Sequence, residues 1–467
     1  MRAIALRFLP RWLRFGLKNA IFWPYIKVAV VRRQGGTRLY FDFSEICSMA
    51  LIVQKYGGSS VATLDLIRQV AKRAIDTKNQ GHQVVVVLSA MKGETDRLLG
   101  MAADMAAEPE PREVDQLIAT GEQTSVALFA LACQTMGEKA KSFTGFQAGI
   151  QTDDIHQKAR IVHVDPARIK TELAKGRIVA VAGFQGMSPG KDLTTLGRGG
   201  SDTTAVALAV ALGADTCEIY TDVDGIYTTD PHICENARKM EKISFEEMME
   251  LSSLGAKVME IRSVEFAMNY NMKIHVRHAH QVGEGTLICE EDIDMEKKPV
   301  TGVAYSKNEA RITLLKVADQ PGIAAKILGI VSASGLVVDM IIQNQSVENG
   351  GSGNGQARTD FSFTVPLSDY AKAMELMEGT AAEIGVERII GTDNIAKISL
   401  VGVGMRNHAG VATQMFTALA KEGINISLIS TSEIKISCII DKKYTELAVR
   451  ALHDAFGLGD TPDVQEG

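Results

Sequence analysis

Short apolar runs and longer amphipathic stretches alternate along the chain from residue 50 onward. Residues 51–53, 84–88 and 178–182 are apolar runs typical of buried strands. Residues 61–78 and 203–212 have the pattern of helices. This alternation indicates an α/β sandwich with a mainly parallel sheet. The same pattern predicts a helix over residues 116–136, a strand over 218–220, two helices within 244–270 and a strand over 273–277.

The last third of the chain repeats itself. The segment DQPGIAAK, which begins at residue 319, leads through a helical stretch to a second glycine and an apolar run, and the segment NHAGVATQ, from residue 407, does the same. Gly322 corresponds to Gly410 and Gly335 to Gly423, with an offset of 88 residues in both cases. A strand, a glycine turn that opens a helix and a second strand, present twice, predict two copies of one small βαβ-type module.

Composition divides the chain further and narrows the class of ligand. The chain of 467 residues has a formal net charge of -6, and its length suits about three domains. Lys and Arg cluster only near the N-terminus, so we expect small-molecule partners and neither nucleic acid nor a membrane. Six scattered cysteines suit reduced thiols in the cytoplasm. The predicted units are an extension over 1–48, a catalytic domain over 49–290, a linker over 291–300, modules over 301–392 and 393–460, and a tail over 461–467.

Residues 1–48 are basic and aromatic and differ from the rest of the chain. One interpretation is a targeting or interfacial amphipathic helix, because basic and aromatic faces suit a membrane surface. The arginines interrupt any apolar core of a secretory signal, and serine is nearly absent, unlike in transit peptides. We favour an appended, poorly ordered extension, with Met49 as the functional start.

Two adjacent glycines follow the first predicted strand, in the segment VQKYGGSS from residue 53. Glycines at a strand-to-helix junction let backbone N–H groups approach phosphate oxygens, and the helix N-terminus favours an anion. Lys55 would then reach a transferring phosphoryl group. The Walker A pattern is absent, and a Gly-Gly pair alone is more often an ordinary turn.

A second candidate segment, TLGRGGSDTT, occupies residues 195–204. Its three glycines free the backbone around Arg198, whose planar guanidinium suits a carboxylate. Ser201 and Asp202 stand at a predicted helix N-terminus, where simple capping explains one of them. Capping does not explain an arginine among three glycines, so we interpret the segment as a binding loop.

Two further segments are candidates for ligand binding. Glu122 follows a glycine in an apolar helical context, where its carboxylate either binds an ammonium group or is merely solvated. Residues 220–231, YTDVDGIYTTDP, run from a strand end into a turn-rich loop with an aromatic side chain. The loop suits the base and ribose of a nucleotide, although alone it would be read as an ordinary turn.

Together these segments resemble the aspartate kinase branch of the amino acid kinase family. The resemblance runs from Met49 almost to the C-terminus and includes KYGGSS at 55–60, SAM at 89–91, Gly121-Glu122, GRGGSD at 197–202 and TDVDGIYTTDP at 221–231, in the family's order and spacing. It implies a three-layer α/β/α sandwich with a mainly parallel sheet, followed by two ferredoxin-like βαββαβ ACT domains.

The resemblance implies phosphoryl transfer from ATP to the side-chain carboxylate of L-aspartate, giving 4-phospho-L-aspartate at the start of the diaminopimelate and homoserine routes to lysine, threonine and methionine. The accepting carboxylate is already ionised at neutral pH, so catalysis reduces to alignment and neutralisation of charge. Mg²⁺ would be held mostly by ATP oxygens and water, and no protein metal site is expected. The implied catalytic residues are Lys55, Arg198 and Asp202.

The implied ligand sites follow the same motifs. Asp202 would orient Lys55 or water around the metal, and Arg198 and Glu122 would bind the charged groups of aspartate. The implied ATP site comprises Lys55, Tyr56, Gly57, Gly58, Ser89, Ser201, Tyr220, Thr221, Asp222, Ile226, Tyr227, Thr228, Thr229, Asp230, Pro231 and Lys257. The implied aspartate site comprises Ser59, Thr95, Glu122, Arg198, Gly199, Gly200 and Ser201.

The repeated modules resemble ACT domains, which implies amino-acid effectors, lysine or threonine or both, and a homo-oligomer formed through these modules. The alternative is that the modules only dimerise. An internal start at Met295 would give a separate regulatory subunit. The effector contacts would be Asp319, Gly322, Ile323, Ala324, Asn344, Gln345, Asn407, Gly410, Val411, Asn425 and Ile426.

Two features depart from the family pattern. His232 stands where relatives commonly have arginine, and residues 348–356 form a Gly-rich insertion within the first module. Two rival functions remain: another amino acid kinase, acting on glutamate, acetylglutamate, carbamate or a nucleotide, and a catalytically silent amino-acid sensor. The paired modules with Glu122 and Arg198 disfavour the first, and the intact Lys55, Arg198 and Asp202 disfavour the second.

Overall fold

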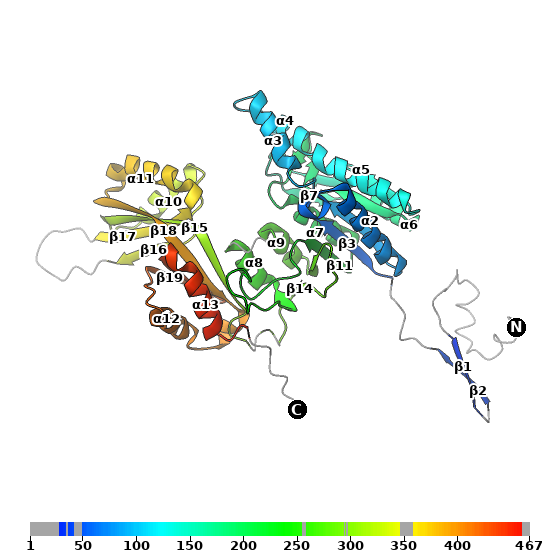
Figure 1. The fold of residues 1–467 in the computed structure, drawn as a ribbon. Coiled ribbons are helices and arrows are strands. Elements are labelled where there is room, and N and C mark those ends of the chain that lie inside the picture. Colours follow the sequence, from blue (N-terminus) through cyan, green and yellow to red (C-terminus); the bar gives the residue numbers. More distant parts are fainter. Residues whose placement is uncertain are drawn as a thin grey trace, which may run out of the picture.

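The structure, a computed structural model, describes residues 28–33, 36–41, 49–254, 258–293, 295, 298–345 and 358–459. Lys257 and the Gly-rich insertion at 348–356 lie outside the described residues, as do most of the extension and the predicted tail. Two parts are visible in Figure 1: a larger part that ends near residue 290 and a smaller part that begins near residue 300.

An eight-stranded sheet forms the centre of the larger part, in the order β12-β14-β13-β11-β3-β4-β8-β5. All neighbours are parallel except β13 and β14. Its central strands are apolar and buried on both faces, as parallel strands between helices must be. This confirms the predicted mainly parallel sheet. The strands are β3 (Leu51–Tyr56), β4 (Gln83–Leu88), β5 (Ala140–Phe143), β8 (Ile178–Ala182), β11 (Thr216–Thr221), β12 (Lys242–Ser244), β13 (Ile274–His278) and β14 (Thr286–Cys289).

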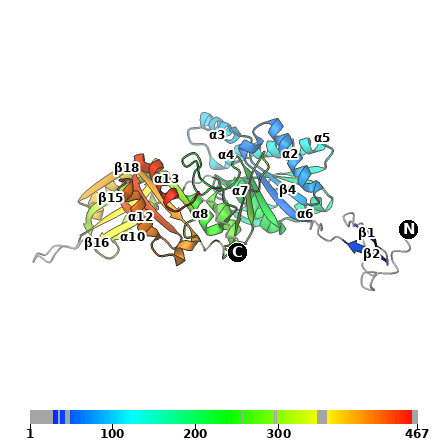
Figure 2. The ribbon, with the colours of Figure 1, turned by 60° about the horizontal axis from the view of Figure 1, so that its bottom comes forward.

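Helices cover both faces of this sheet and make the predicted three layers (Figures 1 and 2). On one face, α2 (Leu64–Asn79) and α5 (Thr120–Thr135) bury their apolar sides in one core. On the other face, a second core includes the helices α6 (Ala167–Ala174), α7 (Gly200–Leu212), α8 (Phe245–Ser253) and α9 (Ile261–Asn269).

Two predicted helix boundaries were wrong. The predicted helix over residues 116–136 is divided into α4 (Pro111–Ile118) and α5, with Ala119 between them. Helix α7 begins at Gly200, three residues before the predicted start, because Gly199 adopts a left-handed conformation (φ 70°) that lets the chain turn directly into the helix. Ser201 and Asp202 therefore lie inside its first turn.

A smaller sheet, a short 3-10 turn and a helix lie beside the main sheet, and the apolar pattern did not predict them. The sheet has the order β10-β9-β6-β7. Its strands are β6 (Ile150–Thr152), β7 (Ile161–Val164), β9 (Gln185–Met187) and β10 (Leu193–Thr195), and the other elements are η2 (Gly58–Val61) and α3 (Glu94–Met105).

The smaller part contains one six-stranded sheet, in the order β16-β17-β15-β18-β20-β19. Helices α10 and α11 pack on the core of the first module, and α12 and α13 on that of the second. The elements are β15 (Gly302–Ala318), α10 (Ile323–Ala333), β16 (Ile341–Gln345), β17 (Arg358–Pro366), α11 (Tyr370–Ile384), β18 (Arg388–Val401), α12 (Val411–Lys421), β19 (Leu428–Thr431), β20 (Lys435–Asp441) and α13 (Thr445–Ala455), with short 3-10 turns at Leu367–Asp369, Val403–Asn407 and Lys442–Tyr444.

The repeat is confirmed at its glycines. Gly322 and Gly410 have φ values of 95° and 93° and precede α10 and α12. Gly335 and Gly423 follow the two helices with φ values of 73° and 68°. Each glycine allows a left-handed turn at the same point of its module.

The two modules share their central strands. β15 pairs with β18 from Gly302 to Leu315, and residues 302–306 pair with residues 397–401 of the second module. The strand that completes the second module therefore precedes the first module in the chain. The predicted boundary between residues 392 and 393 lies inside β18.

Helix α8 joins the larger part to the second module. The buried carboxylate of Glu247 accepts hydrogen bonds from the Thr301 hydroxyl at 2.6 Å and from the Val403 N–H at 3.0 Å. One turn further along the helix, Glu250 forms an ion pair with Lys435 at 2.6 Å. The second module is thus fixed to a helix of the larger part.

Within the extension, β1 (Val28–Arg33) and β2 (Gly36–Phe41) form an antiparallel hairpin apart from the other elements (Figures 1 and 2). No strand was predicted there. Among the helices that the structure describes, none is both long enough and apolar enough for a bilayer crossing.

Candidate active site

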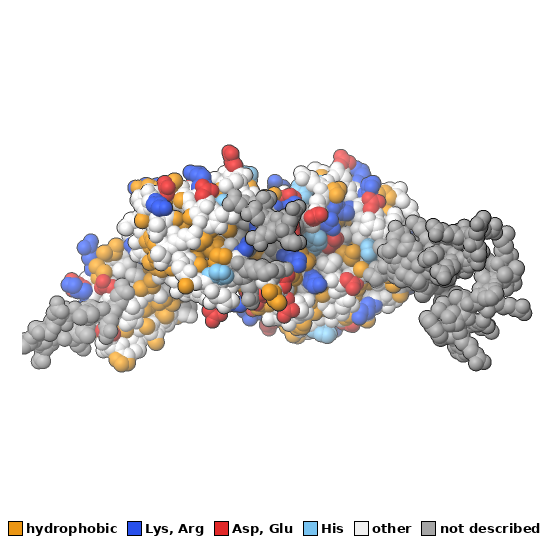
Figure 3. Space-filling view, turned by 90° about the horizontal axis from the view of Figure 1, so that it is seen from below, with side chains coloured by type: hydrophobic (Ala, Val, Ile, Leu, Met, Phe, Trp, Pro, Cys, Tyr) orange, Lys and Arg blue, Asp and Glu red, His pale blue; other side chains and the backbone are white. Residues whose placement is uncertain are grey.

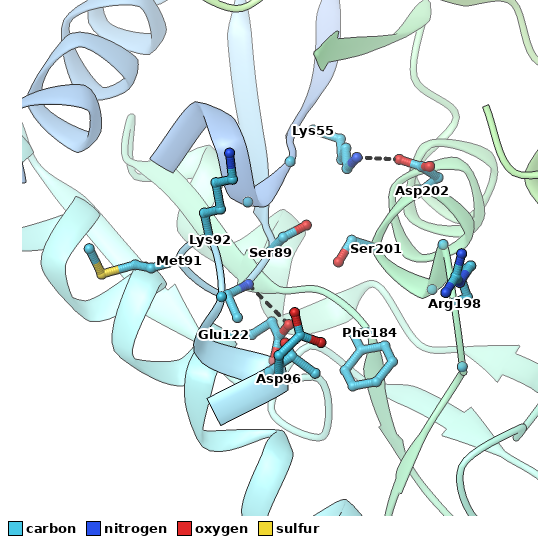
Figure 4. Close-up of a pocket in the computed structure, with 18 residues that line it drawn as sticks. Lys55, Ser89, Met91, Lys92, Asp96, Glu122, Phe184, Arg198, Ser201 and Asp202 are labelled. Atoms are coloured by element: carbon cyan, nitrogen blue, oxygen red, sulfur yellow. Dashed lines mark hydrogen bonds and ion pairs between the residues drawn. The ribbon is translucent and has the colours of Figure 1, made fainter. Parts of the chain in front are cut away.

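A pocket of about 380 Å³ lies at the carboxyl ends of β3 and β4. The start of α7, the loop over residues 89–93 and the start of α5 complete its wall (Figure 4). Ligands commonly bind at the carboxyl ends of parallel strands, where loops and helix N-termini converge. The position is the one expected of an active site in an open parallel sheet.

Lys55 and Asp202 form an ion pair on one side of the pocket, with 2.5 Å between Nζ and the carboxylate (Figure 4). Lys55 lies near the end of β3, and Asp202 lies in the first turn of α7. The two side chains are 12% and 10% exposed, so the pair is largely shielded from water. The α7 N-terminus favours the Asp202 carboxylate. The lysine is therefore held at the pocket wall in a defined orientation.

The Gly57-Gly58 turn brings the backbone close to the opposite loop. A Cβ on Gly58 would lie 3.0 Å from the Ala90 carbonyl oxygen, closer than ordinary packing permits. Ser89 begins this loop and lines the pocket. The absence of a side chain at Gly58 permits this close approach of two backbone segments. Gly57 and Gly58 both line the pocket.

Glu122 is buried at the pocket floor, in the first turn of α5. One carboxylate oxygen accepts a hydrogen bond from the Ala90 N–H at 3.0 Å, and the other has no hydrogen-bond partner among the described residues. Burial raises the pKa of Glu122 to about 7, although the Ala90 N–H acts in the opposite direction. A buried carboxylate with one free oxygen is suited to a cationic ligand.

Arg198 lies at the tip of a tight backbone turn over residues 197–200, in which the other three residues are glycines. This turn is called the arch. Gly197 and Gly199, on either side of it, have φ values of 78° and 70°. A Cβ on Gly199 would lie 2.2 Å from Cγ of Glu260. Arg198 is exposed and lines the pocket on the side opposite Glu122 (Figure 4). Its guanidinium is available to an anionic ligand.

Most residues predicted for the phosphate and aspartate sites meet in this one pocket. The lining includes Lys55, Gly57, Gly58, Ser89, Thr95, Glu122, Arg198, Gly199, Gly200, Ser201 and Asp202. Ser59 does not line it. Lys257 was predicted to reach the nucleotide but lies outside the described residues.

Tyr56 and Tyr220 lie elsewhere. Their rings stack at 4.7 Å in the core beneath α2, and the guanidinium of Arg73 lies 4.9 Å from the centre of the Tyr220 ring. Successive side chains of a strand point to opposite faces, so Tyr56 and Lys55 cannot both face the pocket. The side chains of both tyrosines are packed in the core.

The end of the predicted nucleotide loop is covered by the second module. The Thr228 carbonyl accepts a hydrogen bond from the Val303 N–H at 2.8 Å, and its hydroxyl lies 2.9 Å from Nε2 of the buried His453. The Tyr305 hydroxyl donates to Asp230 at 2.9 Å. The remaining loop residues predicted for ATP, Thr221, Asp222, Ile226, Tyr227, Thr229 and Pro231, also lie outside the described pocket.

The pocket residues that were not predicted as site residues include Lys92, Asp96 and Phe184. Lys92 and Asp96 flank the N-terminus of α3, and Phe184 follows β8. Phe184 has a φ of 68°, which is strained for a residue with a side chain, and its N–H donates to the Thr204 hydroxyl at 3.1 Å. For Lys92 and Phe184 the available signal was a position shortly after a parallel strand, whereas Asp96 lies in the first turn of α3.

The predicted effector residues lie in two separate groups. Asp319, Gly322, Ile323 and Ala324 surround the first turn of α10, whereas Asn407, Gly410 and Val411 surround that of α12. Ile323 and Val411 are buried in the cores of their modules. Asn344 and Gln345 belong to β16, and Asn425 and Ile426 precede β19. β16 and β19 are opposite edges of the sheet.

The fold is that of the amino acid kinase class. A model of the amino acid kinase family matches residues 50–278, and a model of the ACT domain matches residues 398–456. An aspartokinase of Pseudomonas aeruginosa is 54% identical over 416 residues, covering 89% of this chain and 99% of the relative. An aspartokinase of Mycolicibacterium smegmatis is 50% identical over 415 residues, with 88% and 97% covered. The chain therefore belongs to the aspartate kinase family and is a phosphotransferase that uses ATP.

Solved structures agree with this assignment. E. coli aspartokinase III in complex with aspartate and ADP matches with a TM-score of 0.70 and 25% identity, covering 87% of this chain and 99% of that one. The same enzyme in complex with lysine and aspartate matches with a TM-score of 0.69 and 24% identity over 87% and 99%. The second likeness supports the fold.

Proposed function

We propose that the protein transfers the γ-phosphoryl group of ATP to the side-chain carboxylate of L-aspartate, giving ADP and 4-phospho-L-aspartate. The observation that carries this proposal is the meeting of Lys55, Asp202, Glu122 and Arg198 in one pocket. We further propose that the reaction opens the route to lysine, threonine and methionine, and that it takes place in the cytoplasm.

Each of the four charged groups has a separate task. Glu122 binds the ammonium group of aspartate, and Arg198 binds a carboxylate through its planar fork. Lys55 neutralises charge on the transferring phosphoryl group, and Asp202 holds Lys55 in place. The attacking carboxylate, with a pKa of about 3.9, needs no general base at neutral pH. Alignment and charge neutralisation are thus the whole contribution of the protein.

Mg²⁺ would enter with ATP. The described part of the chain contains no group of three His, Cys, Asp or Glu side chains that could hold a metal ion. The pocket does offer the Asp202 carboxylate and open space beside the glycine turn. One carboxylate beside an open space suits a metal ion that is coordinated mainly by phosphate oxygens and water. Mg²⁺ would neutralise phosphate charge.

The direct test is ADP release from Mg-ATP with aspartate or glutamate, with the acyl phosphate trapped by hydroxylamine. We expect an aspartate hydroxamate and no glutamate product above background. Glutamate turnover at a similar rate would identify another amino acid kinase, and a folded protein without turnover would identify a sensor.

We also propose feedback by lysine or threonine at the ACT modules, in a homo-oligomer. The edge strands of the two modules, β16 and β19, lie at opposite edges of the sheet, so a second copy is needed to bring the edge of one module against the edge of the other. Edge strands present unpaired backbone groups that favour such pairing. Hydrophobic side chains are exposed over the smaller part (Figure 3), and the edge strands contribute Ile341 and Ile429.

An internal start at Met295 is compatible with this arrangement. A chain that begins there retains β15, whose residues 302–306 complete the second module. All six strands of the sheet and the four helices that pack on it would be present. We propose that such a product would fold as a regulatory subunit. A single full-length band in cells that express the natural gene would contradict it.

The contact between the second module and the loop at Thr228 predicts how an effector signal reaches the larger part. Tyr305→Phe removes the hydroxyl that binds Asp230 and retains the ring. We expect the concentration for half-maximal inhibition to rise about fivefold, at the low end of allosteric coupling, with little change in uninhibited turnover. Lys316→Met, further along β15, removes an exposed pair with Glu387 at 3.2 Å and is the matched control. Equal inhibition of all three proteins would contradict this route.

A further inference from the structure

Asp115 is a buried carboxylate outside the pocket that binds two segments beside it. It lies on α4 and is fully buried. Its oxygens accept hydrogen bonds from the Thr195 hydroxyl at 2.5 Å, the Thr195 N–H at 3.1 Å and the Gln157 N–H at 3.1 and 3.2 Å. Nδ1 of His156 lies 2.8 Å away. Two backbone N–H groups and two side chains thus converge on one carboxylate.

The groups that Asp115 binds form the base of the Arg198 arch. Thr195 precedes Arg198 by three residues and is itself buried. Gln157 adopts a left-handed conformation (φ 65°), and its carbonyl oxygen lies 3.0 Å from where a Cβ of Gly197 would stand. The arch therefore rests on the segment that Asp115 holds. A left-handed residue with a side chain persists where its surroundings impose it.

A second clamp holds the arch from α9. Arg262 donates to the Leu196 carbonyl at 3.0 Å and to the Ala159 carbonyl at 3.2 Å. The Ala159 N–H donates to the Thr195 carbonyl at 3.0 Å. The N-terminal end of the arch, at Leu196, and the segment over 156–159 are thereby held by Arg262 of α9 as well as by Asp115 of α4. Within the arch, the Gly197 and Gly199 carbonyls accept hydrogen bonds from the Gly200 and Asp202 N–H groups at 3.0 Å. The position of the guanidinium therefore depends on the anchors that hold the base of the arch.

We propose that Asp115 is a positioning residue for substrate: it fixes the base of the arch and so places Arg198 against the carboxylate of aspartate. The inference rests on the proposed role of Arg198 in the reaction. Asp115 itself does not line the pocket. Its loss would act on aspartate binding through Arg198 and would leave the ATP side of the pocket, at Lys55 and Gly58, in place.

The test is steady-state kinetics of Asp115→Ala with both substrates varied. Loss of the carboxylate leaves buried donors without an acceptor, and the arch shifts; a displacement on the order of 1 Å is expected to raise KM for aspartate about 10- to 100-fold. KM for ATP should change less than about twofold. Asp115→Asn is the conservative variant. The oxygen of the asparagine can accept from the two backbone N–H groups while its NH2 group faces the Thr195 hydroxyl. That hydroxyl can accept a hydrogen bond instead of donating one. Asp115→Asn should therefore restore most of the wild-type affinity for aspartate.

Asp192→Ala is the matched control, because Asp192 also joins α4 to the β9–β10 hairpin, through Arg112 at 3.1 Å, but at an exposed position. We expect less than about a twofold change in either KM. In an Arg198→Ala background, adding Asp115→Ala should raise KM for aspartate little further, because the group that Asp115 positions is already absent. If Asp115→Ala does not fold, Thr195→Val, which removes one donor, should raise KM for aspartate a few-fold.

The outcomes separate the two proposals. An active wild type in which Asp115→Ala leaves KM for aspartate unchanged, or raises both KM values equally, overturns the positioning role alone. A multiplicative effect of the two substitutions also overturns it, because Asp115 would then act independently of Arg198. A wild type without aspartate turnover would instead overturn the proposed function.

Discussion

Replacement of Lys55 by methionine is expected to lower kcat by about a thousandfold, in line with the loss of a group that neutralises transition-state charge. Lys55 faces the pocket as the partner of Asp202, in a site largely shielded from water. Charge neutralisation is worth more there than in bulk solvent. Methionine retains a side chain of similar length and apolar character without the ammonium group. The measurement is the initial rate of ADP release with both substrates saturating.

A second lysine provides the control for this substitution. Lys78 also forms a short ion pair, with Glu138 at 2.5 Å, but on α2 and away from the pocket. Lys78→Met removes a partly buried cation in the same way and should leave kcat within about twofold. Thermal midpoints of both variants show whether folding is retained. If Lys55→Met kept more than about a tenth of kcat, phosphoryl charge would have to be neutralised by another group.

The sequence predicted site residues best where a glycine required by the backbone stands close to a charged side chain. Gly58 and Gly199 are glycines because a Cβ would collide with Ala90 and with Glu260, and beside these glycines stand Lys55 and Arg198. Such pairs of a glycine and a charged residue can be found from the chain alone. The buried parallel strands could also be predicted, because apolar runs such as residues 84–88 and 178–182 have few other interpretations.

Contacts between distant segments could not be predicted. Asp115 looks like an ordinary helical carboxylate, and its importance depends on Thr195 and Gln157, which are far from it in sequence. Thr228 looks like part of a nucleotide loop, yet it contacts β15 and α13. No local pattern specifies these partners.

Local sequence patterns also did not specify the topology of the modules or the direction of one aromatic side chain. The 88-residue offset revealed two modules, but not that residues 302–306 complete the second module from in front of the first. Tyr220 was assigned to the nucleotide because it ends a strand in the right motif. Its ring is packed against Tyr56, on the opposite face of the sheet from Lys55, and the motif does not indicate this direction.

Aspartate binding should depend on the ionisation of Glu122. Burial raises the pKa of this carboxyl to about 7, so below that pH the free enzyme holds a neutral acid that cannot balance the ammonium group of aspartate. The expected result is that kcat/KM for aspartate falls about tenfold for each pH unit below about 7 and is level above it. A bound ammonium group favours the ionised form, so kcat should begin to fall at a lower pH than kcat/KM.

The substitution Glu122→Gln separates this ionisation from others in the pocket. The amide has nearly the same shape but no charge, and we expect kcat/KM for aspartate at about pH 8 to fall on the order of a hundredfold, as for a buried charge pair with one partner removed. The remaining activity should be independent of pH across the acidic limb. Glu113→Gln alters an exposed carboxylate of α4 and should retain the wild-type profile. The side-chain carboxylate of aspartate, with a pKa of about 3.9, is ionised throughout this range. A wild-type profile that stays level well below pH 7, or an acidic limb that persists in Glu122→Gln, would therefore place the titrating group elsewhere and remove Glu122 as the ammonium receptor.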